Sequence, residues 1–404
     1  MDQTSKHGWL ILGGVWFINL FLRILMMSVS PLLPLIIADF ELSHWMGGFL
    51  YSLPVLMIAL FSFPLGMVSD RIGIEKAVGC GVTVAVLSSL SRPLSPNFFF
   101  LVLFTALFGF GFAFCFPNLA KLVKEHFPPR LAGTATGIYT TAMPLGAGLG
   151  VSLSGPLLTA MESWRGVFMV WGLMATPVIV LWWVVTRRSS RQKGRPDLEG
   201  PDQPGLQKTS SGHSLSRQSS KPVVICGVLL TLLNLIFYCT LGWLPTYLSE
   251  RGWDSTTAAV ATSLISYVEI PAVFLIPLIS DRVGKRKPII TVSFLVIAIC
   301  SVVLSLQPSV SWWLTPVLGI TFGGVFALLL ALPVELVEKE MVGRAAGAII
   351  SIGYIGALIG PPAVGYLRDL TGGFASGFLI MTLSGIVATG LSFLLPETRA
   401  VKEI

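Results

Sequence analysis

Charged residues are scarce in this chain of 404 residues: Asp, Glu, Lys and Arg together make up only 12%. A soluble globular protein carries about 25% charged residues, and 53% of this chain is hydrophobic. This composition excludes a soluble enzyme, because such a surface is not suited to water. The net charge is +7, but the cations lie between apolar runs, which is typical of a membrane protein and not of a nucleic-acid partner.

Cysteine and histidine are also rare. No C-x-x-C spacing occurs and the four histidines form no cluster, so we predict no disulfide framework, no metal site and no catalytic centre. A Gly-x-x-x-x-Gly-Lys-Ser/Thr loop for nucleotide phosphates is missing. We therefore expect no enzyme activity and no cofactor. The first apolar run has no small-residue cleavage site, and we expect no signal peptide to be removed.

Long apolar runs dominate the chain instead. A helix that crosses a bilayer needs about 20 predominantly apolar residues, and twelve such runs are present. They cover residues 9–36, 46–69, 77–95, 98–122, 132–160, 164–186, 223–249, 258–280, 288–306, 311–335, 345–367 and 374–395. The sequence therefore predicts an all-α membrane protein with twelve transmembrane helices in two six-helix bundles.

The stretch between the sixth and seventh runs differs from the rest of the chain. Residues 187–222 are rich in Ser, Gly, Arg and Lys and contain almost no large apolar residue, so they cannot form a core. We predict an N-terminal bundle over residues 1–186, a basic linker over 187–222, and a C-terminal bundle over 223–404.

The positions of the cations predict the orientation. About 22 Lys and Arg fall in the termini, the linker and the even-numbered loops, whereas the odd-numbered loops hold about four, with Arg92 among them. Positive charge is retained in the cytoplasm. We expect both termini and the linker to be cytoplasmic.

A loop motif occurs twice at equivalent positions of the two halves. The first copy is Gly66-x-x-x-Asp70-Arg71-x-Gly73, after the second run, and the second is Pro277-x-x-x-Asp281-Arg282-x-Gly284, after the eighth. The second half thus repeats the first. Parallel repeats of this kind enclose a substrate site near the bilayer midplane, and the two halves rock around it.

The whole chain resembles a major facilitator superfamily transporter. Residues 23–35 and 237–252 resemble the cyanate permease and nitroimidazole transporter group, and the Arg in the first run with an acid in the eighth is also similar to monocarboxylate transporters. The resemblance implies the major facilitator fold. It also implies a gating role for the loop residues Asp70, Arg71, Asp281 and Arg282, which hold the halves in the outward-facing state; the alternative is a solvated helix cap.

Two charges, Arg23 and Glu269, lie deep in the runs. A charge at the bilayer centre costs roughly 2.5–3.5 kcal/mol on insertion scales, so these side chains are expected to face an interior cavity. The planar guanidinium of Arg23 suits a carboxylate or a cyanate-like anion. For Glu269 two interpretations stay open: it couples anion binding to protonation by competing for Arg23, or it forms a static pair with Arg23.

Further polar residues are candidates for substrate binding. Asn19 lies one helical turn before Arg23, and Asn234 and Tyr238 repeat that spacing in the seventh run. Tyr139 and Tyr354 join them. Each of these groups is equally suited to an interhelical hydrogen bond. Weaker candidates are Asn118, Lys121 and Tyr267. Trp243 is a candidate for closing the cavity, and an anchor at the membrane interface is the alternative for it.

The leading hypothesis is a secondary transporter of a small organic or inorganic anion, monocarboxylate or cyanate-like, coupled to protons. We expect a multi-pass protein of the bacterial inner membrane that acts as a monomer, with the lipid bilayer, the anion and protons as its partners. A proton-driven drug or metabolite exporter is the alternative within transport. From another class, the alternative is a non-transporting membrane sensor, although the linker is too poor in apolar residues to form a soluble domain.

Overall fold

The fold is given by a computed structural model, which describes residues 3–193, 217–338 and 341–396. These residues form helices and connecting turns and contain no strand. In chain order the helices are α1 (Gln3–Met27), α2 (Val29–Asp39), α3 (His44–Ile72), α4 (Ile74–Ser91), η1 (Arg92–Leu94), α5 (Phe98–His126), α6 (Pro129–Thr140), α7 (Ala142–Ser152), α8 (Ser154–Met161), α9 (Trp164–Lys193), α10 (Arg217–Glu250), α11 (Ser255–Val283), α12 (Lys287–Leu306), η2 (Pro308–Val310), α13 (Ser311–Ala331), α14 (Pro333–Leu336), α15 (Val342–Thr371) and α16 (Ala375–Ser392).

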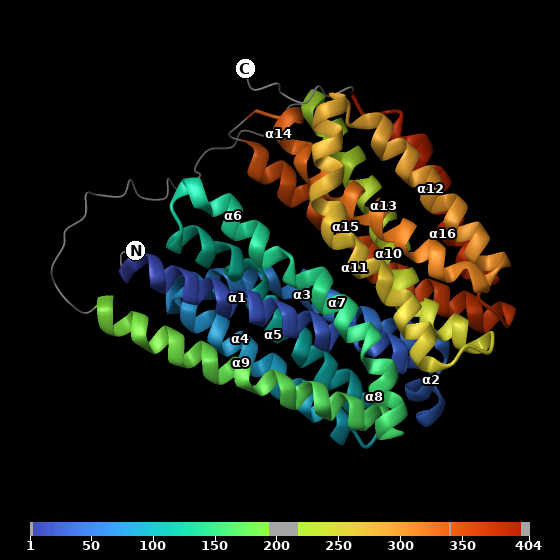
Figure 1. The fold of residues 1–404 in the computed structure, drawn as a ribbon, viewed down its shortest axis with the longest axis horizontal. Coiled ribbons are helices and arrows are strands. Elements are labelled where there is room, and N and C mark those ends of the chain that lie inside the picture. Colours follow the sequence, from blue (N-terminus) through green and yellow to red (C-terminus); the bar gives the residue numbers. More distant parts are fainter. Residues whose placement is uncertain (1–2, 194–216, 339–340, 397–404) are drawn as a thin grey trace.

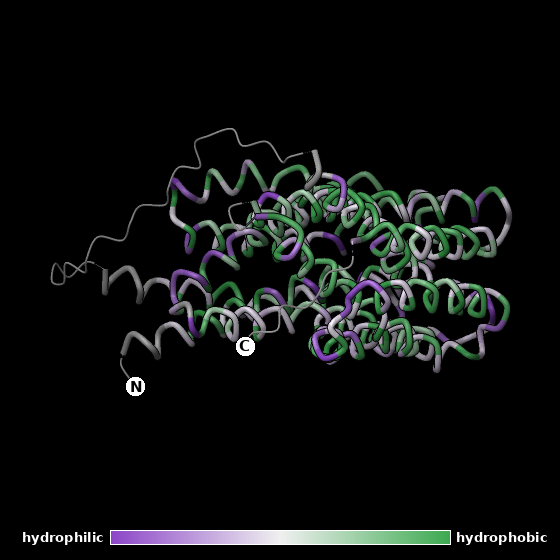
Figure 2. Tube along the Cα trace, turned by 90° about the horizontal axis from the view of Figure 1, so that it is seen from above, coloured by the Kyte–Doolittle hydropathy of each residue, from purple (hydrophilic) through white to green (hydrophobic). Residues whose placement is uncertain are grey.

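Twelve segments of the described chain are long and apolar enough to cross a membrane. They coincide with the predicted runs, so the predicted fold class is confirmed. Viewed from above, hydrophobic residues make up most of each helix, and hydrophilic residues gather toward the helix ends (Figure 2). The stretch predicted as a linker is helical at both ends, since α9 continues to Lys193 and α10 begins at Arg217; its middle part lies outside the described residues.

Two of the spans are broken into shorter helices. The first consists of α1 and α2, and the fifth of α6, α7 and α8. Pro31, Pro144 and Pro156 each occupy the third position of the helix that follows a break. Proline is tolerated in the first turn of a helix, because a backbone N–H there has no acceptor within the helix. In a helix interior it interrupts the helix. These prolines therefore explain where the breaks fall.

The repeated loop motif ends a helix in each half. Gly73 follows α3 with a φ of 92°, and Gly284 follows α11 with a φ of 70°. Left-handed backbone of this kind favours glycine, which carries no Cβ. The glycine of each motif copy thus sets the turn into the next helix.

The helices form two bundles, α1–α9 in one and α10–α16 in the other (Figure 1). Across the boundary, α3 packs against α15 and α7 packs against α11, while α2 and α8 reach α10 and α11. The bundles meet at the end where α2 and α8 lie and diverge toward α6 and α14 (Figure 1). The main contacts of α6 and α14 are with helices of their own bundle.

The third span contains a buried charge that the sequence analysis assigned to the surface. Arg92, predicted among the cations of the odd-numbered loops, is only 1% exposed. Its guanidinium lies 4.4 Å from the ring centroid of Phe108 and 5.6 Å from that of Phe168, and Nη1 donates to the carbonyl oxygen of Leu25. The chain folds back after α4, which brings this residue inward between α1, α5 and α9.

Candidate functional site

A cavity of about 150 Å³ lies between the two bundles. The N-terminal bundle contributes Arg23, Thr140, Thr141, Met143, Pro144 and Ala147 to its lining. The C-terminal bundle contributes Leu233, Asn234, Phe237, Tyr238, Glu269, Ile270, Val273, Phe274, Phe322, Phe326 and Tyr354. Both deep charges predicted from the sequence therefore face one cavity, at the boundary between the repeats.

Arg23 is held on one side only. It is 8% exposed, and Nη1 donates to the hydroxyl oxygen of Tyr238 at 3.3 Å and to Sδ of Met26 at 3.6 Å. Neither Nε nor Nη2 is hydrogen-bonded to a described residue, although Nε is buried. The edge of the guanidinium formed by Nε and Nη2 thus has no partner among the described residues.

Tyr238 fixes the orientation of this guanidinium. The Cζ atom of Arg23 lies 5.7 Å from the centroid of the Tyr238 ring, close enough for attraction between the cation and the negative ring face. The ring of Tyr51 packs edge-on against that of Tyr238, with centroids 6.4 Å apart. Because Tyr238 belongs to α10, Arg23 of α1 contacts the opposite bundle directly.

Glu269 faces the same cavity from α11 and is partly buried. No ion pair within 4.0 Å joins it to Arg23 or to any other described cation. Gly323 of α13 lies directly against this side chain: a Cβ there would be 2.9 Å from Cγ of Glu269. α13 thus packs closely against the Glu269 side chain and provides no cation to pair with its carboxylate.

The other predicted polar residues divide into two groups. Asn234, Tyr238 and Tyr354 line the cavity, and Asn234 also donates through Nδ2 to the carbonyl oxygen of Gly353. Asn19 and Tyr139 are not among the lining residues. Asn19 is 2% exposed and donates to the carbonyl oxygen of Tyr139, 3.1 Å away, so it joins α1 to α6.

The sequence analysis missed the aromatic part of the lining. Phe237, Phe274, Phe322 and Phe326 all face the cavity. Phe322 and Phe326 lie one helical turn apart on α13, a spacing that places them on one helix face. That spacing is visible in the sequence, but nothing local distinguishes a cavity-facing Phe from a lipid-facing one.

The family model described as Major Facilitator Superfamily matches residues 15–361. The chain belongs to this superfamily. The family predicted from the loop motif is thereby confirmed, and the protein is a multi-pass membrane transporter of small molecules and not an enzyme.

Individual members of the superfamily are similar over nearly the full length. An uncharacterized transporter of Bacillus subtilis (strain 168), YycB, is 29% identical over 96% of this chain and 93% of its own. The 2-nitroimidazole transporter of Escherichia coli (strain K12) is 26% identical over 95% and 96%. A bacterial homolog of the human lysosomal transporter Spinster, crystallised inward-facing and unoccupied, shares the fold with a TM-score of 0.83 and 16% identity, covering 98% of this chain and 97% of that one.

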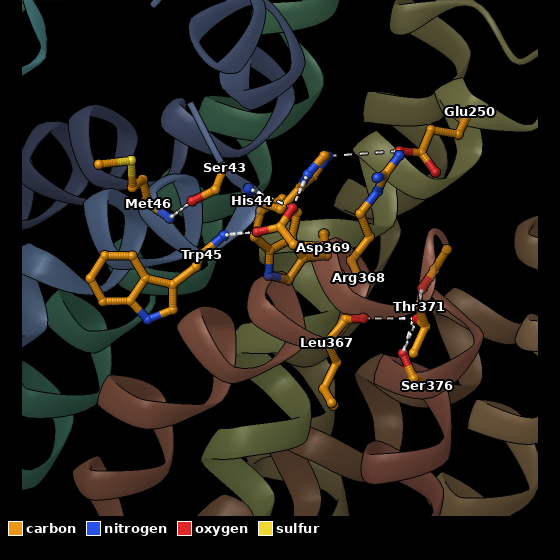
Figure 3. A network of polar contacts seen from close by, with 12 residues as sticks. Ser43, His44, Trp45, Met46, Glu250, Leu367, Arg368, Asp369, Thr371 and Ser376 are labelled. Atoms are coloured by element: carbon orange, nitrogen blue, oxygen red, sulfur yellow. Dashed lines mark hydrogen bonds and ion pairs between the residues drawn. The ribbon is translucent and has the colours of Figure 1, made fainter. Parts of the chain in front are cut away.

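This superfamily member is closed on the face of the odd-numbered loops by a network between the bundles (Figure 3). The carboxylate of Asp369 in α15 accepts hydrogen bonds from the backbone N–H groups of His44 and Trp45, each at 3.0 Å, and lies 2.7 Å from Nδ1 of His44. It therefore caps the N-terminus of α3, where an anion is favoured. Arg368 binds Glu250 at 2.9 Å, and Glu250 is 3.9 Å from Nε2 of His44.

Close backbone contacts accompany this network. A Cβ on Gly48 of α3 would overlap the carbonyl of Pro361, and one on Gly365 of α15 would overlap the carbonyl of His44. Ser30 of α2 donates to the carbonyl oxygen of Leu241 in α10. The two bundles are thus in contact at the level of their main chains on this face.

The weaker sequence candidates have structural partners. Asn118 accepts a hydrogen bond from Ser69, and Tyr267 shares one with Ser152 across the bundle boundary, at 2.8 Å in both cases. Trp243 is 2% exposed and donates to the carbonyl oxygen of Pro361. Because it is buried between α10 and α15, it is not an anchor at the membrane surface.

On the face of the even-numbered loops, the charged residues pair within each bundle. Asp70 accepts a hydrogen bond from Lys121 at 2.7 Å. In the second copy of the motif, Arg286 lies 3.6 Å from Asp281 and 2.6 Å from Glu335. Arg71 and Arg282 are exposed, and no ion pair connects either of them to another described residue.

Proposed function

We propose that this transporter carries a small organic anion by alternating access, with Arg23 as the anchor of the anion. The observation that carries the proposal is the free Nε–Nη2 edge of Arg23 in a cavity between the two repeats. A buried guanidinium is retained in a membrane only where it has a task. A carboxylate that binds this edge would accept two parallel charge-assisted hydrogen bonds.

The rest of the lining supports an anion. Arg23 is the only cation among the residues that line the cavity, and no described carboxylate, Glu269 included, lies within 4.0 Å of its guanidinium. A cationic ligand would be repelled, which argues against an exporter of cationic drugs. The polar groups of Asn234 and Tyr354 in the same lining would orient the bound molecule.

Glu269 is proposed as the proton-coupling group. It shares the cavity with Arg23 without forming a pair with it, so its carboxylate is available to take up and release a proton during transport. An arriving anion would bring a second negative charge near Glu269, and binding would therefore favour its protonated form. Net transport would then follow the proton gradient.

The side of the membrane to which the cavity opens follows from the predicted orientation of the chain. With both termini cytoplasmic and the protein in a bacterial inner membrane, the face closed by Asp369 and His44 is extracytoplasmic, and the described state faces inward. The units that rock would be the bundles of residues 1–186 and 223–404, connected by 187–222, in a monomer. Asp70 and Asp281, with Arg71 and Arg282, would act as gating residues on the cytoplasmic face.

Ligand binding to the purified transporter tests the anion site. Monocarboxylates from acetate to benzoate are compared with their neutral amides and with benzylamine, by the rise in melting temperature and by calorimetry. Each carboxylate that binds should bind more tightly than its amide. Arg23→Lys should weaken carboxylate binding about tenfold or more, because the planar fork is lost.

The matched control is Arg165→Lys. Arg165 forms a 2.6 Å ion pair with Asp39 outside the cavity, and its replacement should leave the affinities unchanged. Amides or the amine that bind as tightly as the carboxylates would overturn the proposal and favour the exporter of neutral or cationic compounds.

A further inference from the structure

The two bundles contribute chemically different parts of the cavity. The N-terminal bundle supplies the cation, Arg23, and two hydroxyl groups from Thr140 and Thr141. The C-terminal bundle supplies a wall that is mainly apolar, formed by Phe237, Ile270, Val273, Phe274, Phe322 and Phe326. The C-terminal bundle adds four polar side chains to this wall. A ligand that contacts both bundles could therefore place a charged end on Arg23 and an apolar end against the wall.

The apolar wall consists mostly of aromatic rings with a defined arrangement. Phe237 of α10 and Phe322 of α13 pack at nearly right angles, with centroids 5.3 Å apart and an interplanar angle of 88°. Phe326 follows one turn after Phe322, and Phe274 lies on α11 one turn beyond Ile270. Aromatic rings prefer this edge-to-face contact with one another, and the less buried Phe274 and Phe326 offer ring surface to a further ring.

Phe274 leaves a large apolar area without protein contact. Its side chain belongs to the cavity lining and is 46% exposed. An anion of three or four atoms bound at Arg23 would leave the exposed ring of Phe274 uncovered. A ligand with a ring would remove this apolar surface from water, which contributes to binding in proportion to the area buried.

The charges of the lining limit the ligand to one negative group. Beyond Arg23, the lining contains no second cation, and its other ionisable side chains are Glu269 and the tyrosines Tyr238 and Tyr354. A second carboxylate on the ligand would lie in the same cavity as the Glu269 carboxylate without a partner of opposite charge, and a buried unpaired charge is costly.

We infer that the substrate is a monocarboxylate with an aromatic ring as its body, its carboxylate on Arg23 and its ring against the phenylalanines of the C-terminal bundle. This inference rests on the proposed anion site and adds the class of the substrate body. The substrate would then connect the two bundles, since its head binds one and its ring binds the other.

A series of probes that share the carboxylate tests the body of the ligand. Benzoate should bind at least about tenfold more tightly than acetate, because the ring buries apolar surface. Cyclohexanecarboxylate should bind more weakly than benzoate, and terephthalate, with a second carboxylate, more weakly still. Affinities are measured by calorimetry on the purified full-length transporter.

Variants in the wall identify where the ring binds. Phe274→Leu and Phe326→Leu should each weaken benzoate binding about threefold or more and change acetate binding little. Phe274 is substantially exposed, so its replacement is not expected to disturb folding. Phe99→Leu is the control, since Phe99 is 69% exposed and lies outside the cavity.

The outcomes separate this inference from the proposed function. If acetate binds as tightly as benzoate and both bind more tightly than their amides, the proposed anion site is supported. The inference that the substrate has an aromatic ring is then wrong. Equal affinity for cyclohexanecarboxylate and benzoate also overturns the aromatic assignment. If benzamide binds as tightly as benzoate, it is the proposed anion site that fails.

Discussion

Nη1 of Arg92 donates a 3.0 Å hydrogen bond to the carbonyl oxygen of Leu25, two residues after Arg23 and just before α1 ends at Met27. The carbonyl end of a helix carries partial negative charge, and a cation there is favourable. Arg92 has no carboxylate partner, and its Nε and Nη2 are buried without hydrogen bonds to described residues. A buried charge of this kind adds little net stability. From its position at the end of α1 we predict instead that Arg92 helps to position Arg23.

Arg92→Met tests this positioning role. The variant removes the hydrogen bond to Leu25 but fills a similar volume, so the melting temperature should change by only a few degrees. Carboxylate binding should nevertheless weaken several-fold, about two- to tenfold, because the end of α1 is no longer fixed. Arg92→Lys should recover part of the affinity.

Tyr247→Phe is the control for this experiment. It removes hydrogen bonds from a buried side chain to the carbonyl oxygens of Leu304 and Ser305. All three residues belong to the C-terminal bundle, whereas Arg92 belongs to the N-terminal one, so the carboxylate affinity should stay unchanged. Unchanged carboxylate affinity in Arg92→Met would show that Arg92 does not position the anion site.

Glu269→Gln should separate binding from coupling. The amide cannot exchange a proton, so accumulation of substrate driven by a proton gradient should stop, whereas exchange of labelled for unlabelled substrate should continue. Both activities are measured in proteoliposomes with an imposed pH gradient. Glu162→Gln, at a turn outside the cavity, should retain both activities. Accumulation against a gradient by Glu269→Gln would rule out the coupling role.

Asp369→Asn should loosen the face that His44 and Asp369 close. The amide keeps one acceptor oxygen but loses the charge at the N-terminus of α3. A cysteine introduced at the cavity residue Met143 should then react faster with an impermeant thiol reagent added from the odd-loop side. The chain without the added cysteine provides the blank.

Asp39→Asn is the matched control for Asp369→Asn. Asp39 carries the same charge on the same face, but its partner Arg165 belongs to its own bundle. Its replacement should leave the reactivity at position 143 unchanged. Equal reactivity in the Asp369 and Asp39 variants would mean that the bundles are not held together by the Asp369 carboxylate.

Asp70→Asn should alter the balance of conformations and leave stability nearly unchanged. The Asp70 and Lys121 side chains are 62% and 39% exposed, and a pair as exposed as this contributes about 0–1 kcal/mol. If Asp70 acts as a gate, the accessibility of cysteine probes at the two mouths of the cavity should shift toward the inward-facing state. Identical accessibility in the variant and the parent would remove the gating role.

Labelling of single cysteines tests the orientation. Ser255→Cys at the start of α11 should react with an impermeant reagent in intact cells, whereas Lys124→Cys near the end of α5 should react only after the membrane is opened. The two positions lie on opposite faces, which makes each the control for the other. The reverse pattern would mean that the described cavity faces outward.

The sequence predicted the fold and the two charged residues of the cavity because these signals are local. Twelve apolar runs, a repeated loop motif and two charges within apolar runs are each visible in a short stretch of chain. Arg92 was misjudged for the same reason. It lies at the end of an apolar run, where a cation normally belongs to a loop, and only the packing of α5 and α9 buries it.

Contacts between the bundles were beyond the reach of the sequence pattern. His44 and Asp369 are 325 positions apart, and no periodicity relates them. The role of Asn19 was undecided for a similar reason: an amide in a membrane helix suits a ligand and a neighbouring carbonyl equally well. The aromatic wall also went unnoticed, because Phe is common on lipid-facing and cavity-facing surfaces alike.

Gly48 and Gly365 are positions where the closed face has no room for a side chain. Their missing side chains allow the main chains of α3 and α15 to touch, a contact that the proposed alternating access would break when the bundles separate there. A larger residue at either position would spare the fold and the anion site but would prevent one of the two states. One added methyl group at either glycine would thus act on the closure of this face and not on the affinity for the substrate.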